Sequence, residues 1–113
     1  MDDPDPNVMD YYYITDFSSR ELPGQDLDVA APGSWIVGPY QLNSGQLSYY
    51  YLGGTSMASP HVAGAAALLM QQDQTLSNID VENLLISSAK LIPGFTADEQ
   101  GAGVIDVSKA LGY

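Results

Sequence analysis

The chain has 113 residues and a formal net charge of −11, with fourteen acidic residues against three basic ones. The cations Arg20, Lys90 and Lys109 are scattered, so they form no basic patch, which argues against nucleic-acid binding. The absence of cysteine excludes disulfides and thiolate-ligated metal sites. A hydrophobic content of 45 % excludes general disorder. The acidity is typical of a solvated surface, with cation binding or adaptation to high salt as alternatives.

Residues 1–13 are predicted to be a mobile or truncated N-terminal end, because two prolines and four aspartates fall within the first ten positions. This end has neither the basic nor the apolar region of a signal peptide. The run at residues 11–15 is nevertheless rich in aromatic and β-branched residues, which favour a strand.

Three more short strands are predicted before residue 53. Residues 27–31 form a strand that is closed by a turn at Pro32 and Gly33. Residues 35–37 and 47–52 flank a polar loop, so we expect them to pair as a hairpin.

An apolar helix is predicted after residue 54. Residues 62–70 have no polar side chain at any helical angle, so every face of this helix must be covered. Such a helix belongs in the middle of a larger domain, and the chain is interpreted as a segment of one. The apolar run is about half the roughly 20 residues that cross a bilayer, so no membrane span is predicted.

Two further helices are predicted near the C-terminus. Ser77, with Asp80 three residues later, resembles a capping box, although Asp stands where Glu or Gln is preferred. The apolar spacing that follows predicts a helix as far as Ser88. Asp106 is predicted to cap a last short helix.

Ser56 is predicted to lie at the start of the apolar helix, where unpaired N–H groups and the positive end of the helix dipole converge. A serine there is either a simple cap or a nucleophile whose own N–H holds an oxyanion. His61 lies about 140° around the helix and roughly 7.5 Å along it, so it is a poor base. We expect His61 to be partly buried and hydrogen-bonded to a neighbouring segment.

Residues 54–64 read Gly-Thr-Ser-Met-Ala-Ser-Pro-His-Val-Ala-Gly. This run resembles the nucleophile segment of the subtilisin-like serine proteases (subtilases, peptidase family S8), whose signature it matches at every position. Residues 14–20, 28–33 and 101–107 are similar to other segments of that family, in the same order. The resemblance implies an α/β fold, in which residues 14–113 are the C-terminal third of a three-layer α/β/α domain with a mostly parallel sheet.

The same resemblance implies the chemistry of a serine endopeptidase. Ser56 is then the nucleophile and its backbone N–H an oxyanion donor, while Gly54, Thr55 and Met57 bind substrate. Subtilases order their triad Asp, His, Ser along the chain, but no histidine precedes Ser56 here, and neither Asn7 nor Asn43 lies in the family's oxyanion motif. This chain alone is therefore expected to be inactive.

For the complete domain, the resemblance implies an extracellular enzyme with polypeptide substrates. Its partner is the remainder of its own catalytic domain. Structural calcium is implied there, although no calcium ligand set is identified in this chain. Tyr49, Tyr50 and Tyr51 are expected to alternate between the two faces of a strand, or else to contact the primed side of a substrate.

Other classes of function remain open at this point. The chain could be an inactive fragment or homologue with a structural or interaction role. A sedolisin-like acid protease also uses a Gly-Thr-Ser element, whereas an α/β-hydrolase is disfavoured because no histidine follows His61.

Overall fold

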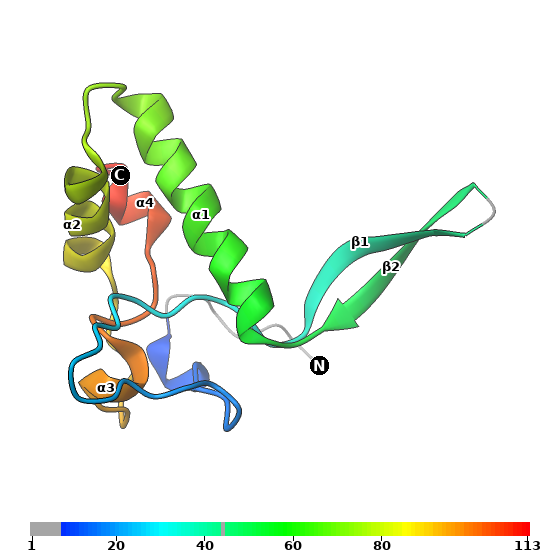
Figure 1. The fold of residues 1–113 in the computed structure, drawn as a ribbon, viewed down its shortest axis with the longest axis horizontal. Helices are drawn as coiled ribbons and strands as arrows, with labels where there is room; N and C mark the ends of the chain where they lie inside the picture. The colour runs from blue at the N-terminus through cyan, green and yellow to red at the C-terminus, as the bar shows by residue number, and fades with distance from the viewer. Residues whose placement is uncertain (1–7, 44) are drawn as a thin grey trace.

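The computed structural model describes residues 8–43 and 45–113. A 3-10 turn, η1 (Met9–Tyr11), precedes a hairpin of the strands β1 (Ile36–Asn43) and β2 (Gln46–Leu52). Four helices follow: α1 (Thr55–Gln72), α2 (Asn78–Ser88), α3 (Ala97–Gln100) and α4 (Val107–Ala110). The hairpin extends from the start of α1, and the other helices lie toward the far side of α1 (Figure 1).

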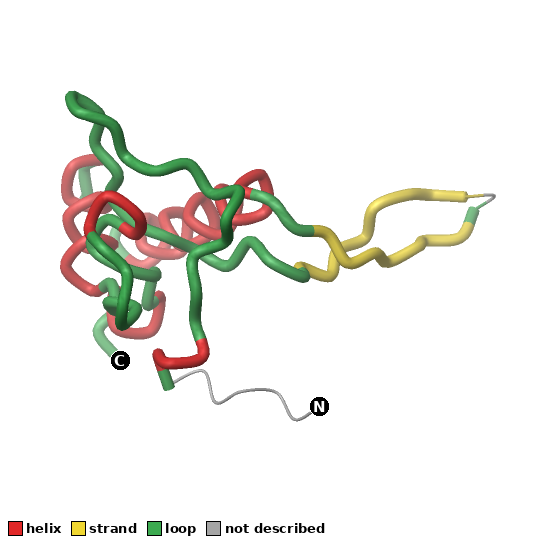
Figure 2. Tube along the Cα trace, turned by 90° about the horizontal axis from the view of Figure 1, so that it is seen from below, coloured by secondary structure: helices red, strands yellow, loops and turns green. Residues whose placement is uncertain are grey.

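The hairpin is antiparallel, as the sequence predicts, but β1 continues to Asn43 through most of the stretch that was predicted to be a polar loop. Ile36 pairs with Leu52 and Val37 with Tyr51, and the register shifts between Pro39 and Gln41. Both views show the hairpin projecting away from the helices (Figures 1 and 2). Its strands therefore meet the rest of the described chain only near the turn that leads into α1.

The core lies where α1, α2 and α4 meet. Ala65 and Leu69 of α1 are buried against Val81 and Leu85 of α2 and Ala110 of α4. These positions recur at helical spacing, so one stripe of each helix faces the others. This small core fixes the C-terminal half of α1, whereas the start of α1 is held by other contacts.

Much of α1 is uncovered by the described residues. Leu68 is 47 % exposed and Met70 is 52 % exposed, and the small residues Ala63, Gly64 and Ala67 are exposed as well. A helix that is apolar all round but covered on one side has surface left for another body of protein. The expectation that this helix belongs in a larger domain stays a prediction.

The predicted caps of α2 and α4 are confirmed. Ser77 Oγ accepts from the Asp80 N–H at 3.2 Å, and Asp80 Oδ2 accepts from the Ser77 N–H at 2.9 Å. Asp106 Oδ1 accepts from the Lys109 N–H at 3.0 Å. Hydrogen bonds to the charged form lower the pKa of Asp80 below its usual value, chiefly the one from the Ser77 hydroxyl.

Two glycines allow the C-terminal segment to approach other parts of the backbone: Gly101 lies against the segment before the hairpin, and Gly103 lies against the segment after α2. Gly101 has φ 62°, and a Cβ there would lie 2.5 Å from the Asp28 carbonyl oxygen. Gly103 has φ 120°, and a Cβ there would overlap the Lys90 carbonyl. At both positions, only a residue without a side chain allows so close an approach of the backbones.

The predicted strand at residues 11–15 is wrong, because Tyr11 ends a 3-10 turn and residues 12–15 have no regular structure. The strand at residues 27–31 is reduced to isolated bridges from Val29 to Gly101 and from Ala30 to Val104. A strand needs a partner along its edge, and within the described residues neither segment has a continuous one. The predicted mobile end at residues 1–13 stays a prediction, and residues 1–7 lie outside the described part.

Candidate nucleophile site

Ser56 occupies the second position of α1 and its side chain is exposed. The preceding Gly54 carbonyl accepts from the N–H groups of Met57 (2.9 Å) and Ala58 (3.3 Å), which closes the first turn. Within the described residues no carbonyl accepts from the Ser56 N–H. The hydroxyl and the N–H of one residue are therefore both open at the positive end of an 18-residue helix.

Gly33 positions the turn before Ser56. Its carbonyl accepts from the Gly54 N–H at 2.7 Å. A Cβ on Gly33 would lie 2.9 Å from the Gly54 carbonyl oxygen and 3.3 Å from Ala58 Cβ. The sequence predicted Gly33 only as part of a turn. The available signal for its contact with the start of α1 was a second glycine, Gly54, at the point of contact.

The predicted substrate-binding residues Gly54, Thr55 and Met57 share this turn with Ser56. The Met57 side chain folds back over it, since a Cβ on Gly54 would lie 3.6 Å from Met57 Sδ. The sulfur is thus next to the turn that precedes Ser56, and Met57 is half-buried. Contact of these residues with a substrate stays a prediction.

His61 lies on the exposed side of α1, and its Nδ1 is 2.7 Å from the Met57 carbonyl oxygen. The expectation of a partly buried histidine bound to a neighbouring segment is wrong on both counts. The carbonyl one helical turn earlier is within reach of the ring, and no described segment covers that face. Within the described residues His61 makes no hydrogen bond to Ser56, in agreement with its rejection as the base.

A cavity of about 580 Å³ lies beside the start of α1. Gly54, Thr55 and Val62 line it from the helix, and residues 12–15 and 29–34 line it from the preceding segments. Ser56 and Met57 are not among its lining residues. The cavity therefore adjoins two of the predicted substrate-binding residues but not Ser56.

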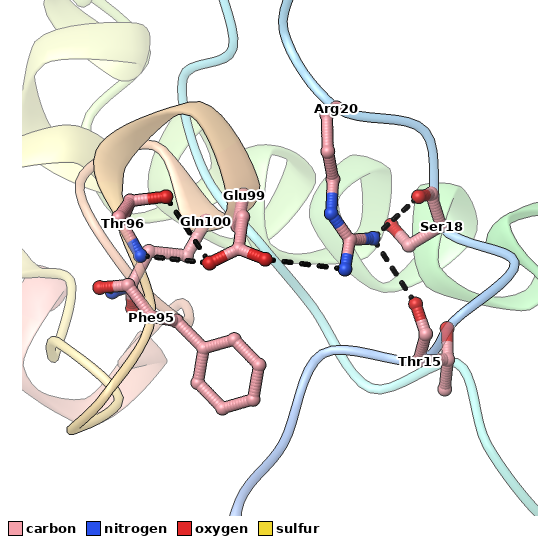
Figure 3. Close-up of polar contacts among 7 residues, drawn as sticks. All are labelled: Thr15, Ser18, Arg20, Phe95, Thr96, Glu99 and Gln100. Carbon is pink, nitrogen blue, oxygen red and sulfur yellow. Dashed lines mark hydrogen bonds and ion pairs between the residues drawn. The ribbon is translucent and has the colours of Figure 1, made fainter.

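An arginine ties one wall of this cavity to α3 (Figure 3). The Arg20 guanidinium donates to the carbonyls of Thr15 (3.2 Å) and Ser18 (2.5 Å) and pairs with Glu99 at 3.3 Å. Glu99 also accepts from the Thr96 N–H at 2.9 Å. The Thr96 N–H is the largest cause of a lowered pKa at Glu99, to which Arg20 adds. This capping of α3 was missed from the sequence.

The described residues contain no group of three or more His, Asp or Glu side chains that could hold a metal ion. No described helix is both long and apolar enough to cross a membrane.

Comparison with known proteins gives concordant matches. The sequence profile of the subtilase family matches residues 9–112. Thermitase of Thermoactinomyces vulgaris is 43 % identical over 98 residues, which cover 85 % of this chain and 32 % of that protein. An extracellular protease of Xanthomonas campestris pv. campestris is 43 % identical over 94 residues, covering 78 % of this chain and 16 % of the relative.

Subtilisin DY of Bacillus licheniformis is 44 % identical over 87 residues, covering 77 % of this chain and 30 % of that protein. The chain thus spans between 16 % and 32 % of the length of these three relatives. Among solved structures, a protease from Pseudoalteromonas arctica superposes with a TM-score of 0.67 at 35 % identity. That match covers 75 % of this chain and 28 % of the other.

Proposed function

Because the chain belongs to the subtilase family of serine peptidases, we propose that Ser56 is the nucleophile of an endopeptidase. The observation that carries the proposal is the placement of Ser56, exposed at the start of α1, with its N–H unpaired among the described residues. The alternative role of Ser56 as a helix cap is disfavoured, because the N-cap position of α1 is occupied by Gly54 and Ser56 lies two positions further on.

In the proposed reaction, Ser56 Oγ attacks the carbonyl carbon of the scissile peptide bond while a general base takes the hydroxyl proton. The Ser56 N–H donates to the oxyanion that develops. The base returns the proton to the leaving amine, which departs and leaves an acyl-enzyme. Water then attacks the ester and regenerates the serine.

The base, the acid that orients it and the second oxyanion donor are proposed to come from another part of the catalytic domain. Within the described residues no imidazole reaches Ser56, and the uncovered side of α1 has room for such a body. This chain alone is proposed to be inactive, and the complete enzyme is proposed to be extracellular with polypeptide substrates. The names of the relatives support that assignment, since they include an extracellular protease and subtilisins.

The test is labelling with a serine-directed fluorophosphonate. We expect the reagent to modify Ser56 in the complete protein, to leave the Ser56→Ala variant unlabelled, and to leave the isolated 113-residue chain unlabelled. Peptide mapping identifies the modified residue. Labelling at another serine, or unimpaired hydrolysis by Ser56→Ala, would contradict the proposal.

A pH profile separates the acid-protease alternative from this proposal. An imidazole base loses its function when protonated, so hydrolysis should fall below about pH 6.5. Optimal activity near pH 4 would instead favour the sedolisin-like alternative.

A further inference from the structure

One face of the hairpin is aromatic and open to solvent. Successive side chains of a strand point to opposite faces, and directly paired residues share a face. Val37 pairs with Tyr51 and Pro39 with Tyr49, so these four side chains lie together. Val37 is 53 % exposed, Tyr49 62 % and Tyr51 68 %. The opposite face carries Tyr50, which is 46 % exposed.

This face is also uncharged in a strongly acidic protein. None of the fourteen acidic and three basic residues lies between Val29 and Gln72, a stretch that contains the whole hairpin and α1. A solvated surface in such a chain would be expected to carry carboxylates. Exposed aromatic side chains without charges are typical of contact surfaces.

The two uncovered surfaces of the charge-free stretch differ in chemistry. The open side of α1 presents aliphatic and small side chains, such as Leu68 and Met70, which suit permanent burial. The hairpin face presents the tyrosines Tyr49 and Tyr51, whose rings pack against apolar groups while the hydroxyl stays hydrated. The hairpin face is therefore suited to exposure to solvent when no ligand is bound and to burial when one is bound. Such a surface suits a reversible ligand better than a fixed domain contact.

The hairpin leads directly to the nucleophile. β2 ends at Leu52, four positions before Ser56, and the hairpin joins the start of α1 (Figure 1). With a rise of about 3.3 Å per residue, Tyr51 and Tyr49 lie roughly 3 Å and 10 Å from Leu52 along the strand. An extended polypeptide has the same rise, so one that is held at Ser56 and follows the hairpin reaches these side chains several residues away from its scissile bond.

We propose that Val37, Tyr49 and Tyr51 form a binding face for apolar or aromatic residues of a polypeptide substrate, on one side of the scissile bond and several positions from it. This inference rests on the proposed function of Ser56. The face selects by apolar contact, since it has no charge with which to attract or repel a substrate.

The test compares extended peptides in the complete enzyme that contains this chain. Each of two series compares a peptide that has Phe and Leu at positions three to five from the cleaved bond with a peptide that has only Ser there. These positions lie on the acyl side of the bond in one series and on the leaving-group side in the other. The variants are Tyr49→Thr with Tyr51→Thr, and Tyr50→Thr as the control on the opposite face. Threonine keeps a high strand preference, so the hairpin should persist.

In the Tyr49→Thr/Tyr51→Thr variant, the ratio of kcat/KM for apolar-extended over serine-extended peptides should fall about tenfold in one of the two series, since each aromatic contact contributes a few-fold. Tyr50→Thr should leave that ratio unchanged. An unchanged ratio in both series, or an equal fall in Tyr50→Thr, would overturn the proposal. A change of oligomeric state in gel filtration would also overturn it, because the face would then bind a second copy.

A binding measurement keeps the two proposals separable. Fluorescently labelled apolar-extended peptide should bind the Ser56→Ala enzyme, and the two threonine substitutions should weaken that binding about tenfold. Binding that depends on the tyrosines, without any hydrolysis by the unmodified enzyme, would refute the role of Ser56 but support the face. Hydrolysis at Ser56 with peptide binding that ignores the tyrosines would refute the face alone.

Discussion

Replacement of Gly33 by alanine should impair the nucleophile turn without touching Ser56. A Cβ on Gly33 would lie 2.9 Å from the Gly54 carbonyl oxygen, about 0.5 Å short of the 3.4 Å at which ordinary contact begins. The second neighbour, Ala58 Cβ at 3.3 Å, is also part of α1. Neither obstacle is the end of a flexible side chain, so the backbone at the start of α1 must move.

The size of the effect follows from that displacement. A misplacement of about 1 Å in catalytic groups costs on the order of 100-fold, so a shift of about 0.5 Å should lower kcat/KM roughly tenfold. Overpacking of this kind typically costs about 1–3 kcal/mol of stability. The Gly54 N–H to Gly33 carbonyl bond should lengthen as the two segments separate.

The assay is the rate of fluorophosphonate labelling of Ser56 and kcat/KM on a short peptide, together with the thermal unfolding temperature. Gly38→Ala is the matched control, because a Cβ there meets nothing within 4 Å and no positive φ is involved. Unchanged labelling and turnover in a folded Gly33→Ala enzyme would refute the reasoning, since the clash would then be relieved away from α1.

Three further predictions concern stability of the complete protein and are measured by thermal or urea unfolding. Gly101→Ala should destabilise more than Gly94→Ala, because both have positive φ but only Gly101 meets backbone within 4 Å; equal losses would show that φ alone matters. Ser77→Ala should cost about 1 kcal/mol through loss of the α2 cap, and no loss would contradict the cap. The pKa of Asp106 is lowered in the folded protein, chiefly by the hydrogen bond from the Lys109 N–H and then by Lys90. The ionised Asp106 side chain therefore contributes its full stabilisation of the folded state above about pH 4, and this contribution is lost as the pH falls through the pKa of Asp106 in the folded protein. Asp106→Asn, which keeps a capping oxygen, should flatten that acid limb, whereas an unchanged limb would assign it to other carboxylates.

The sequence predicted those elements whose signals are local and complete. The hairpin was predicted from two strand-forming runs around a polar loop, and α2 and α4 from Ser77 and Asp106, whose side chains cap the helices as expected. The resemblance to the nucleophile segment of the subtilases is carried by residues 54–64, with support from three flanking segments. In these places the residues that decide the structure are neighbours in the sequence.

The sequence-based predictions failed where the structure depends on a contact with a distant residue, or where a local motif was overlooked. Residues 11–15 have strand-forming side chains but no continuous partner in the described part. Gly33 acts on Ser56 through Gly54, twenty-one positions later, which no local pattern shows. The cap of α3 was visible, since Thr96 and Glu99 have the spacing of a capping box, but it was not recognised.

The distribution of charge connects the nucleophile, the hairpin face and the uncovered helix. Every charged side chain lies outside residues 29–72. Two of the three basic residues pair within the flanking segments, Arg20 with Glu99 and Lys90 with Asp106 at 2.8 Å. These two ion pairs lie within the flanking segments, while the neutral stretch contains the uncovered surfaces of α1 and the hairpin. Because burial of carboxylates without partners is costly, a stretch free of them is suited to contacts with polypeptide: the rest of the domain on α1 and, as we propose, substrate on the hairpin.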